Sequence, residues 1–229
     1  LRINPLDIVN QEYKKRFNDD IRINSNLEYS IIPGLSFKVS GGISNLASRY
    51  DQFNNTRTRS GNLYRQDGVN ASVENRKNFS WLNENTLTYK GAFDAKKEHA
   101  FDLMIGETLQ GGKTNYLYQR VIRIPNEDLG MSGMSQGETQ KTNIFNTEWR
   151  LLSFLSRFNY NYKSKYYFTA TVRADGSSKF PKENRWGYFP SVGLGWNMHE
   201  ESFLKNVKFL SSAKLRGSWG QTGNNRIPD

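Results

Sequence analysis

Alternation of apolar and polar residues along residues 151–197 is the feature that most limits what this 229-residue chain can fold into. Phe154 and Phe158 fall on one face of an extended segment, whereas Arg157 falls on the other. Short polar breaks interrupt the pattern twice, at 163–165 and 175–178. Segments joined by such short breaks predict antiparallel hairpins, so three neighbouring strands are expected here.

The two faces of these strands differ in a way that limits their surroundings. The apolar face is rich in Tyr and Trp near the strand ends, and the polar face carries Arg, Asn and Thr instead of a second packed core. A membrane β-barrel needs both features, an apolar outer face with aromatic girdles and a polar interior. A soluble β-sandwich also alternates, so periodicity alone leaves both classes open.

Composition excludes several other classes. No run of 18 apolar residues exists, so no membrane-spanning helix is expected, and the absence of cysteine rules out disulfides and thiolate metal sites. The net charge of +10 would suit a nucleic-acid partner, but the basic residues are scattered and match no nucleic-acid motif, so none is expected. Residues 1–20 are polar and hold no signal peptide, which predicts a mature, trimmed or partial chain.

Five further segments alternate in the same way, which brings the expected number of strands to about eight. They are residues 21–30, 35–50, 80–93, 99–109 and 211–221. The connections alternate in length, with short turns such as Pro33-Gly34 and two long loops at about 51–79 and 110–147. Short turns at one end of a sheet and long loops at the other are typical of outer-membrane barrels, and sandwiches have no reason to keep this asymmetry.

Candidate sites for bond chemistry are few. His99 and His199 lie far apart in the sequence and have no partner for a catalytic triad or a metal pair. The adjacent acids Glu200 and Glu201 fit the first turn of a short helix over 200–206 better than an acid/base pair. We therefore expect no enzyme activity, no metal and no cofactor.

The longer loop, 110–147, is the candidate substrate surface. Its Tyr116 and Tyr118 are suited to stacking on sugar rings, and its Arg120 and Arg123 to pairing with anionic groups. The alternative is that these side chains only pack the loop against its neighbours.

Six motifs follow one another along the second half of the chain. They are Ser156–Tyr162 (SRFNYNY), Lys165–Tyr167 (KYY), Arg173–Phe180 (RADGSSKF), Gly187–Trp196 (GYFPSVGLGW), Glu200–Leu204 (EESFL) and Lys214–Asn224 (KLRGSWGQTGN). As an ordered series, they resemble the SusC/RagA class of TonB-dependent outer-membrane transporters. A weaker likeness over Asn85–Gly106 extends the resemblance to most of residues 20–229, with the two long loops as the divergent part.

This resemblance implies a 22-stranded antiparallel transmembrane β-barrel, closed by an N-terminal plug and energised by TonB. Residues 1–229 would be part of that barrel domain, about eight strands, without the plug and the C-terminal strands. Arg157, Arg173 and Lys214 would line the lumen, and the apolar faces would meet lipid of the outer membrane of a Gram-negative bacterium. A SusD-like surface lipoprotein would deliver the nutrient, an oligosaccharide or a peptide.

Two other classes stay open on the sequence. One is a complete, small outer-membrane barrel with a structural or adhesion role, because eight strands can close around a filled interior. In that case the first and last strands would pair. The other is a soluble sugar-binding β domain, in which the apolar stripes would be covered by a second layer of protein.

Overall fold

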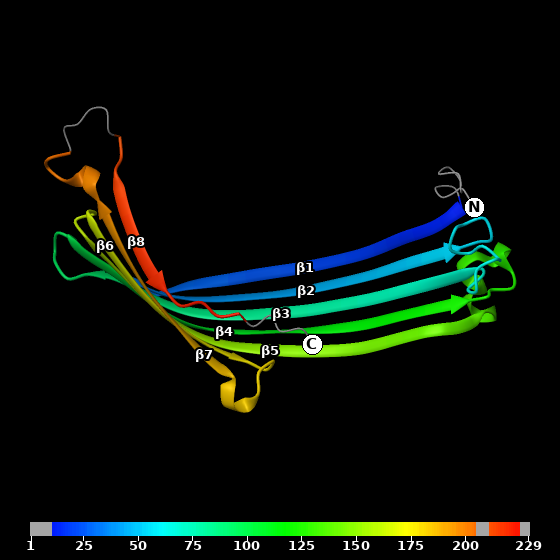
Figure 1. Ribbon diagram of the computed structural model, residues 1–229. Helices are drawn as coiled ribbons and strands as arrows, with labels where there is room; N and C mark the ends of the chain where they lie inside the picture. The colour runs from blue at the N-terminus through cyan, green and yellow to red at the C-terminus, as the bar shows by residue number, and fades with distance from the viewer. Residues whose placement is uncertain (1–10, 205–210, 225–229) are drawn as a thin grey trace. The chain divides into compact units, whose positions relative to one another are not determined.

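The computed structural model of the chain describes residues 11–204 and 211–224, and eight strands form one sheet in it. Each strand pairs with the next in sequence order, from β1 to β8 without a crossover (Figure 1). The strands are β1 (Glu12–Ile32), β2 (Leu35–Asn54), β3 (Asn70–Ala92), β4 (His99–Ile122), β5 (Glu138–Tyr162), β6 (Tyr166–Ser177), β7 (Trp186–Asn197) and β8 (Lys214–Gly220). The expectation of an all-β fold with about eight strands is confirmed.

The chain divides into two compact units, which we name after the connections that they contain. The loop unit comprises Leu1–Ile23, Ile43–Ser80 and Gly112–Glu148. The turn unit comprises Asn24–Gly42, Trp81–Gly111 and Trp149–Asp229. Strands β1 to β5 contribute residues to both units, and β6 to β8 belong to the turn unit.

Within the turn unit, the sheet from β5 to β8 sorts side chains as the alternation predicts. Strand β6 is antiparallel to both β5 and β7, with Phe168 opposite Tyr160 and Leu194. Strand β8 places Trp219 opposite Val192 of β7. Residues that face each other across a ladder share one face of the sheet. That face is uncovered, since the exposed fraction is 64% for Leu194 and 63% for Trp219.

The arrangement of the strands overturns both alternatives to a barrel wall. All eight described strands belong to one sheet, so no second sheet covers the apolar face, and the two-layered soluble domain is wrong. In the part of the chain that the structure describes, β1 pairs only with β2 and β8 only with β7. A complete eight-stranded barrel would pair β1 with β8, so this alternative is wrong as well.

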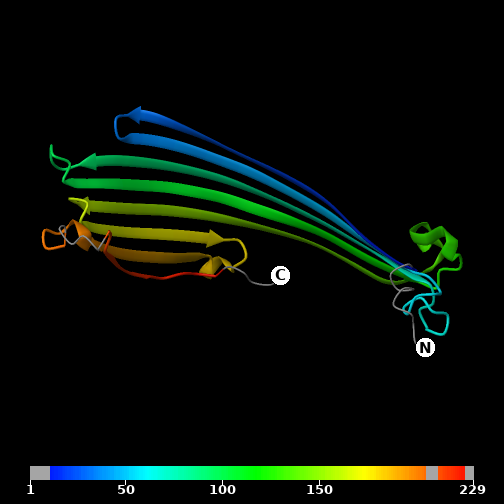
Figure 2. The ribbon, with the colours of Figure 1, turned by 90° about the horizontal axis from the view of Figure 1, so that it is seen from above.

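The short turns and the long loops segregate as expected. The β1–β2 turn at Pro33-Gly34 contacts β3, because the Lys90 amide donates to the Gly34 carbonyl (2.7 Å). The β3–β4 and β5–β6 turns are also linked, since the Lys163 amide donates to the Glu98 carbonyl (2.7 Å). These three turns lie in the turn unit, whereas the β2–β3 and β4–β5 loops lie in the loop unit (Figure 2).

The buried apolar side chains gather mainly in the loop unit. A cluster forms where β2 and β4 end and β3 begins, and Tyr13, Met131 and Met134 pack against it. Its members are Phe53, Val69, Ala71, Val121 and Ile124. Among the described residues of the turn unit, Leu151 is the one buried large apolar side chain. The loop unit is therefore held by a small core of its own, whereas the turn unit keeps its apolar residues on an open face.

The strands are longer, and the loops shorter, than the sequence predicted. The expected loops at about 51–79 and 110–147 shrink to 55–69 and 123–137, and β1 begins at Glu12 within the expected irregular entry. Some of the added strand residues are polar on both faces, as in Glu138–Asn143 (ETQKTN). Where both faces of a strand contact water, ladder hydrogen bonds still hold it, but no apolar stripe marks it in the sequence.

The expected helix over 200–206 is also wrong in the described residues. A single 3-10 turn, η3 (Met198–Glu200), is followed by a turn through Leu204, and the remainder lies outside the described residues. Two other short 3-10 segments occur, η1 (Glu127–Gln136) and η2 (Lys182–Asn184). No helix among the described residues has the length and apolar character needed to cross a bilayer.

Candidate functional site

The polar face of the turn unit carries all three residues expected in the lumen. Arg157 pairs with Thr171 across β5 and β6, Arg173 pairs with Phe189 across β6 and β7, and Lys214 pairs with Asn197 across β7 and β8. Because opposite residues and residues two apart point the same way, the three cations share one face. That this face lines a lumen stays a prediction.

The three cations differ in their surroundings. Arg173 is occupied, because its Nε donates to Asp175 Oδ1 (2.7 Å) and its Nη2 to Ser153 Oγ (3.1 Å). The ammonium of Lys214 lies 4.0 Å from the ring centre of Tyr167, a cation–π contact. Arg157 is exposed and lines an open depression beside Arg173.

A pocket of about 380 Å³ opens at the end of this face where β6 and β7 are joined. It brings together three segments that are distant in the sequence. Arg173 and Asp175 come from β6, Arg185 from the β6–β7 connection, and the segment after β8 closes the pocket with Gly223 and Asn224. Phe180 and Phe189 also line it, whereas the ring of Trp186 stacks on Phe154 on the apolar face of the sheet. Nothing in the sequence marks Arg185 as a site residue, because only the pairing of neighbouring strands brings it to this pocket.

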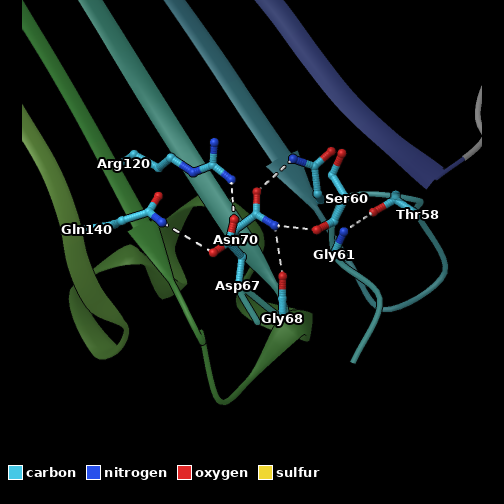
Figure 3. Close-up of polar contacts among 9 residues, drawn as sticks. Thr58, Ser60, Gly61, Asp67, Gly68, Asn70, Arg120 and Gln140 are labelled. Atoms are coloured by element: carbon cyan, nitrogen blue, oxygen red, sulfur yellow. Dashed lines mark hydrogen bonds and ion pairs between the residues drawn. The ribbon is translucent and has the colours of Figure 1, made fainter. Parts of the chain in front are cut away.

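The loop unit is built around Asn70, the first residue of β3 (Figure 3). Its buried amide donates to the carbonyls of Ser60 (2.9 Å) and Gly68 (2.8 Å) and accepts a hydrogen bond from Asn54 Nδ2 (2.9 Å). Thr58 closes the same loop, since its hydroxyl accepts from the Gly61 amide (2.9 Å). A loop with so many local bonds presents its exposed side chains from a defined backbone.

The two long loops also hold each other. The Ile124 amide donates to the Val69 carbonyl (3.0 Å), and Glu127 accepts from the amide (2.7 Å) and the hydroxyl (3.1 Å) of Thr56. In Figure 2, η1 (green) and the β2–β3 loop (cyan) accordingly lie at the same end of the loop unit. The two loops form one folded surface.

Three of the four predicted substrate residues lie on a strand and not in a loop. Tyr116, Tyr118 and Arg120 lie on β4, and Arg123 directly follows it. The first three share a face of the strand because they are two residues apart. The prediction placed them in a loop because the polar end of β4 carries no alternation.

Contacts within the chain already occupy most of these four side chains. Arg120 Nη2 contacts Asp67 Oδ2 (2.8 Å), and Gln140 holds the other carboxylate oxygen of Asp67 (Figure 3). Arg123 pairs with Glu138 through Nε (2.9 Å) and Nη2 (2.5 Å).

Tyr116, the first of these four residues, also makes contacts within the chain. Tyr116 stacks on Phe145 at 4.6 Å between ring centres and lies under the Arg76 guanidinium. The role of the four residues Tyr116, Tyr118, Arg120 and Arg123 in substrate binding stays a prediction.

Glu201, expected in a short helix, instead forms hydrogen bonds that stabilise the turn unit. Glu201 accepts hydrogen bonds from the Tyr166 hydroxyl (2.6 Å), the Lys165 ammonium (3.0 Å) and the Trp196 indole (3.2 Å). These donors, the tyrosine foremost, lower the pKa of Glu201 to about 2. The segment after β7 is thereby tied to the β6 and β7 ends.

Neither histidine belongs to a metal-binding group among the described residues. His99 Nδ1 is 2.6 Å from the Tyr160 hydroxyl, and its ring packs on Tyr162. Among the described residues, no group of three or more His, Cys, Asp or Glu side chains is placed to hold a metal ion. The arrangement offers cations, aromatic rings and amides, which are groups for binding.

Comparison with known proteins identifies the class. No protein-family model matches the chain. TonB-dependent receptor P3 of Formosa agariphila is 33% identical over 225 residues, which cover 98% of this chain and 22% of the receptor. TonB-dependent receptor SusC of Bacteroides thetaiotaomicron is 39% identical over 133 residues, which cover 56% of this chain and 12% of the receptor. The chain therefore spans about a fifth of the length of the first of these relatives.

Solved structures agree on the fold. A chain of the RagAB peptide transporter matches with a TM-score of 0.80 at 24% sequence identity, covering 96% of this chain and 24% of that one. The RagAB peptide importer in its open-open state gives a TM-score of 0.83 at 23% identity. The chain belongs to the SusC/RagA class of TonB-dependent receptors, as part of their β-barrel wall.

Proposed function

We propose that this chain forms part of the barrel wall of an outer-membrane importer, with its apolar face toward lipid and its polar face toward the lumen. The observation that carries the proposal is the open face of the turn unit, where large apolar side chains lie exposed on neighbouring strands. They include Phe154, Val172, Val192, Leu194, Leu215 and Trp219. In water such a surface would promote aggregation, whereas in a bilayer lipid tails cover it.

The free sheet edges support a larger barrel. Strands β1 and β8 each pair on one side within the described residues, and an unpaired edge is not tolerated in the hydrocarbon region. Further strands of the same barrel would satisfy these edges. The strand lengths fit as well, because β3 to β5 have 23 to 25 residues and a membrane crossing needs about 9–11. The surplus residues would extend beyond the hydrocarbon region.

The imported substrate in this proposal is an oligosaccharide or a peptide, delivered by a SusD-like surface lipoprotein and released inward by TonB acting on a plug. The similar RagAB structure is that of a peptide transporter, which supports a peptide as substrate, and the relative named TonB-dependent receptor SusC supports the action of TonB. The mechanism is binding and conformational change, without bond chemistry. Tyr118, together with the ion-paired Arg120 and Arg123, would form part of the outer binding surface.

Spin labels at adjacent positions test which face meets lipid. The chain contains no cysteine, so Leu194→Cys and Gly193→Cys each introduce one defined label site in this segment. Leu194 lies on the apolar face and Gly193 on the polar face, where an added Cβ would make only ordinary van der Waals contact with Ser218 (3.8 Å). In outer membranes, the label at position 194 should collide more with oxygen, and the label at 193 more with a water-soluble nickel complex. Equal accessibility at both positions would contradict the proposal.

Uptake tests the transport step. Cells that carry the full-length receptor should accumulate a labelled oligosaccharide or peptide, and removal of TonB should abolish the accumulation. Removal of the SusD-like surface lipoprotein should weaken the accumulation. Uptake that persists without TonB would rule out this mechanism.

A further inference from the structure

The pocket at the β6–β7 connection is not explained by a role in the barrel wall. Wall residues need only ladder bonds and a lipid face, but here three motifs of the sequence converge on one hollow. They are the motif with Arg173 and Asp175, the segment before β7 with Arg185, and the segment with Gly223 and Asn224. All lie within the turn unit.

The charges of this pocket are unbalanced. Asp175 is the one acidic residue that lines it, and its carboxylate already accepts from Arg173 Nε. Arg173 also contacts Ser153, so this guanidinium is occupied. Arg185 forms no ion pair with any described carboxylate, and its Nε is buried without a hydrogen-bond partner. Buried donors in folded proteins are almost always paired, so an acceptor from elsewhere is expected at Arg185.

The walls of the pocket limit the kind of molecule that brings this acceptor. Phe180 and Phe189 supply flat apolar surface, and Asn184 adds an amide. A volume of about 380 Å³ falls in the range of small-ligand sites, roughly 300–1,000 Å³. A guanidinium is a planar fork that matches a carboxylate in a bidentate pair. Asp175 nearby disfavours a second negative charge, so a monoanion fits better than a phosphate dianion.

We propose that this pocket binds a carboxylate group of the imported nutrient, with the carboxylate on Arg185 and the body of the molecule against the aromatic wall. Access to the pocket from the lumen rests on the proposed function, but the binding itself does not. The carboxylate could belong to a uronic acid or to the free end of a peptide, and both share this chemistry.

Binding to the purified full-length receptor in detergent tests the assignment by titration calorimetry. The probes are digalacturonate against neutral digalactose, and a tripeptide against the same tripeptide amide. At least one carboxylate probe should bind roughly 10- to 100-fold more tightly than its neutral counterpart, as expected for hydrogen bonds to a charged group. The probe pair with the larger difference in affinity identifies the source of the carboxylate.

Two substitutions separate the pocket from general positive charge. Arg185→Gln should remove the preference for the carboxylate, whereas Arg216→Gln, an exposed cation on β8 outside this pocket, should leave it intact. If Arg185→Gln does not fold, Arg185→Lys keeps the charge but not the fork, and the preference should still fall. The inference is overturned if neither carboxylate probe is preferred, or if the preference survives both changes at position 185.

Failure of this inference differs from failure of the proposed function. A receptor that imports neutral nutrients with TonB but shows no carboxylate preference keeps the transporter role and loses the pocket. A receptor that shows the preference, sensitive to Arg185→Gln, but imports nothing keeps the pocket and loses transport.

Discussion

Asn70 offers the sharpest test of how the loop unit is held together. Replacing it by Asp keeps the size and shape of the side chain but removes the amide donor. The carbonyls of Ser60 and Gly68 would then lose their partner and face a carboxylate oxygen. Each buried carbonyl left unsatisfied costs about 1–3 kcal/mol, so we expect Asn70→Asp to destabilise the β2–β3 loop by about 4 kcal/mol.

Protonation of the introduced carboxyl limits this penalty. Neutral pH lies about three units above the ordinary pKa of Asp. Protonating the carboxylate at pH 7 therefore costs about 4 kcal/mol, at about 1.36 kcal/mol per pH unit. The protonated acid would restore one donor. Because this group binds its proton more readily in the folded loop than in the opened loop, the destabilisation should shrink as the pH falls from 7 to 5.

Trypsin provides the assay, since the same loop carries Arg57, Arg59 and Arg65. When opening is rapid, the cleavage rate follows the population of the opened loop, so about 4 kcal/mol corresponds to roughly a thousandfold faster cleavage. Asn62→Asp is the matched control, because the Asn62 side chain only accepts from the Tyr64 amide (2.9 Å) and a carboxylate does the same. Equal cleavage of the two variants at pH 7 would refute the assigned role of Asn70.

Three further predictions concern the turn unit, each measured by thermal unfolding of the receptor in detergent. Glu201→Gln should lower the melting temperature at pH 5 and above. The pKa of Glu201 is lowered from 4.5 to about 2, so its ionised form stabilises the fold above pH 4.5. The difference in melting temperature between variant and parent should vanish as the pH falls toward 2. Ser164→Gly should raise stability by about 1 kcal/mol, since Ser164 has φ +57° in the β5–β6 turn, and a loss of stability would contradict this strain. Gly34→Ala should cost more than about 2 kcal/mol, because φ is +87° and a Cβ would collide with the Lys90 carbonyl; an unchanged melting temperature would show that this turn adjusts freely.

The sequence determined the faces of the strands where the two sides meet different surroundings. Along β5 to β8 the alternation placed Phe154 and Leu194 on one face and Arg157 and Arg173 on the other, and the register confirms these assignments. Side-chain direction has a period of two in any strand, so this information is local. The order of turns and loops was predictable for the same reason, because Pro33-Gly34 and other turn residues act over a few positions.

The tertiary structure decided what depends on neighbours distant in the sequence. The polar ends of β4 and β5 are strands because adjacent strands supply hydrogen bonds, which no residue pattern records. The pairing of Arg120 with Asp67, 53 positions away, removes a charge that looked free in the sequence. Arg185 shows the reverse, since a residue that appeared ordinary is left without a partner in a shared pocket. Charge balance depends on which side chains meet, and only the folded sheet brings them together.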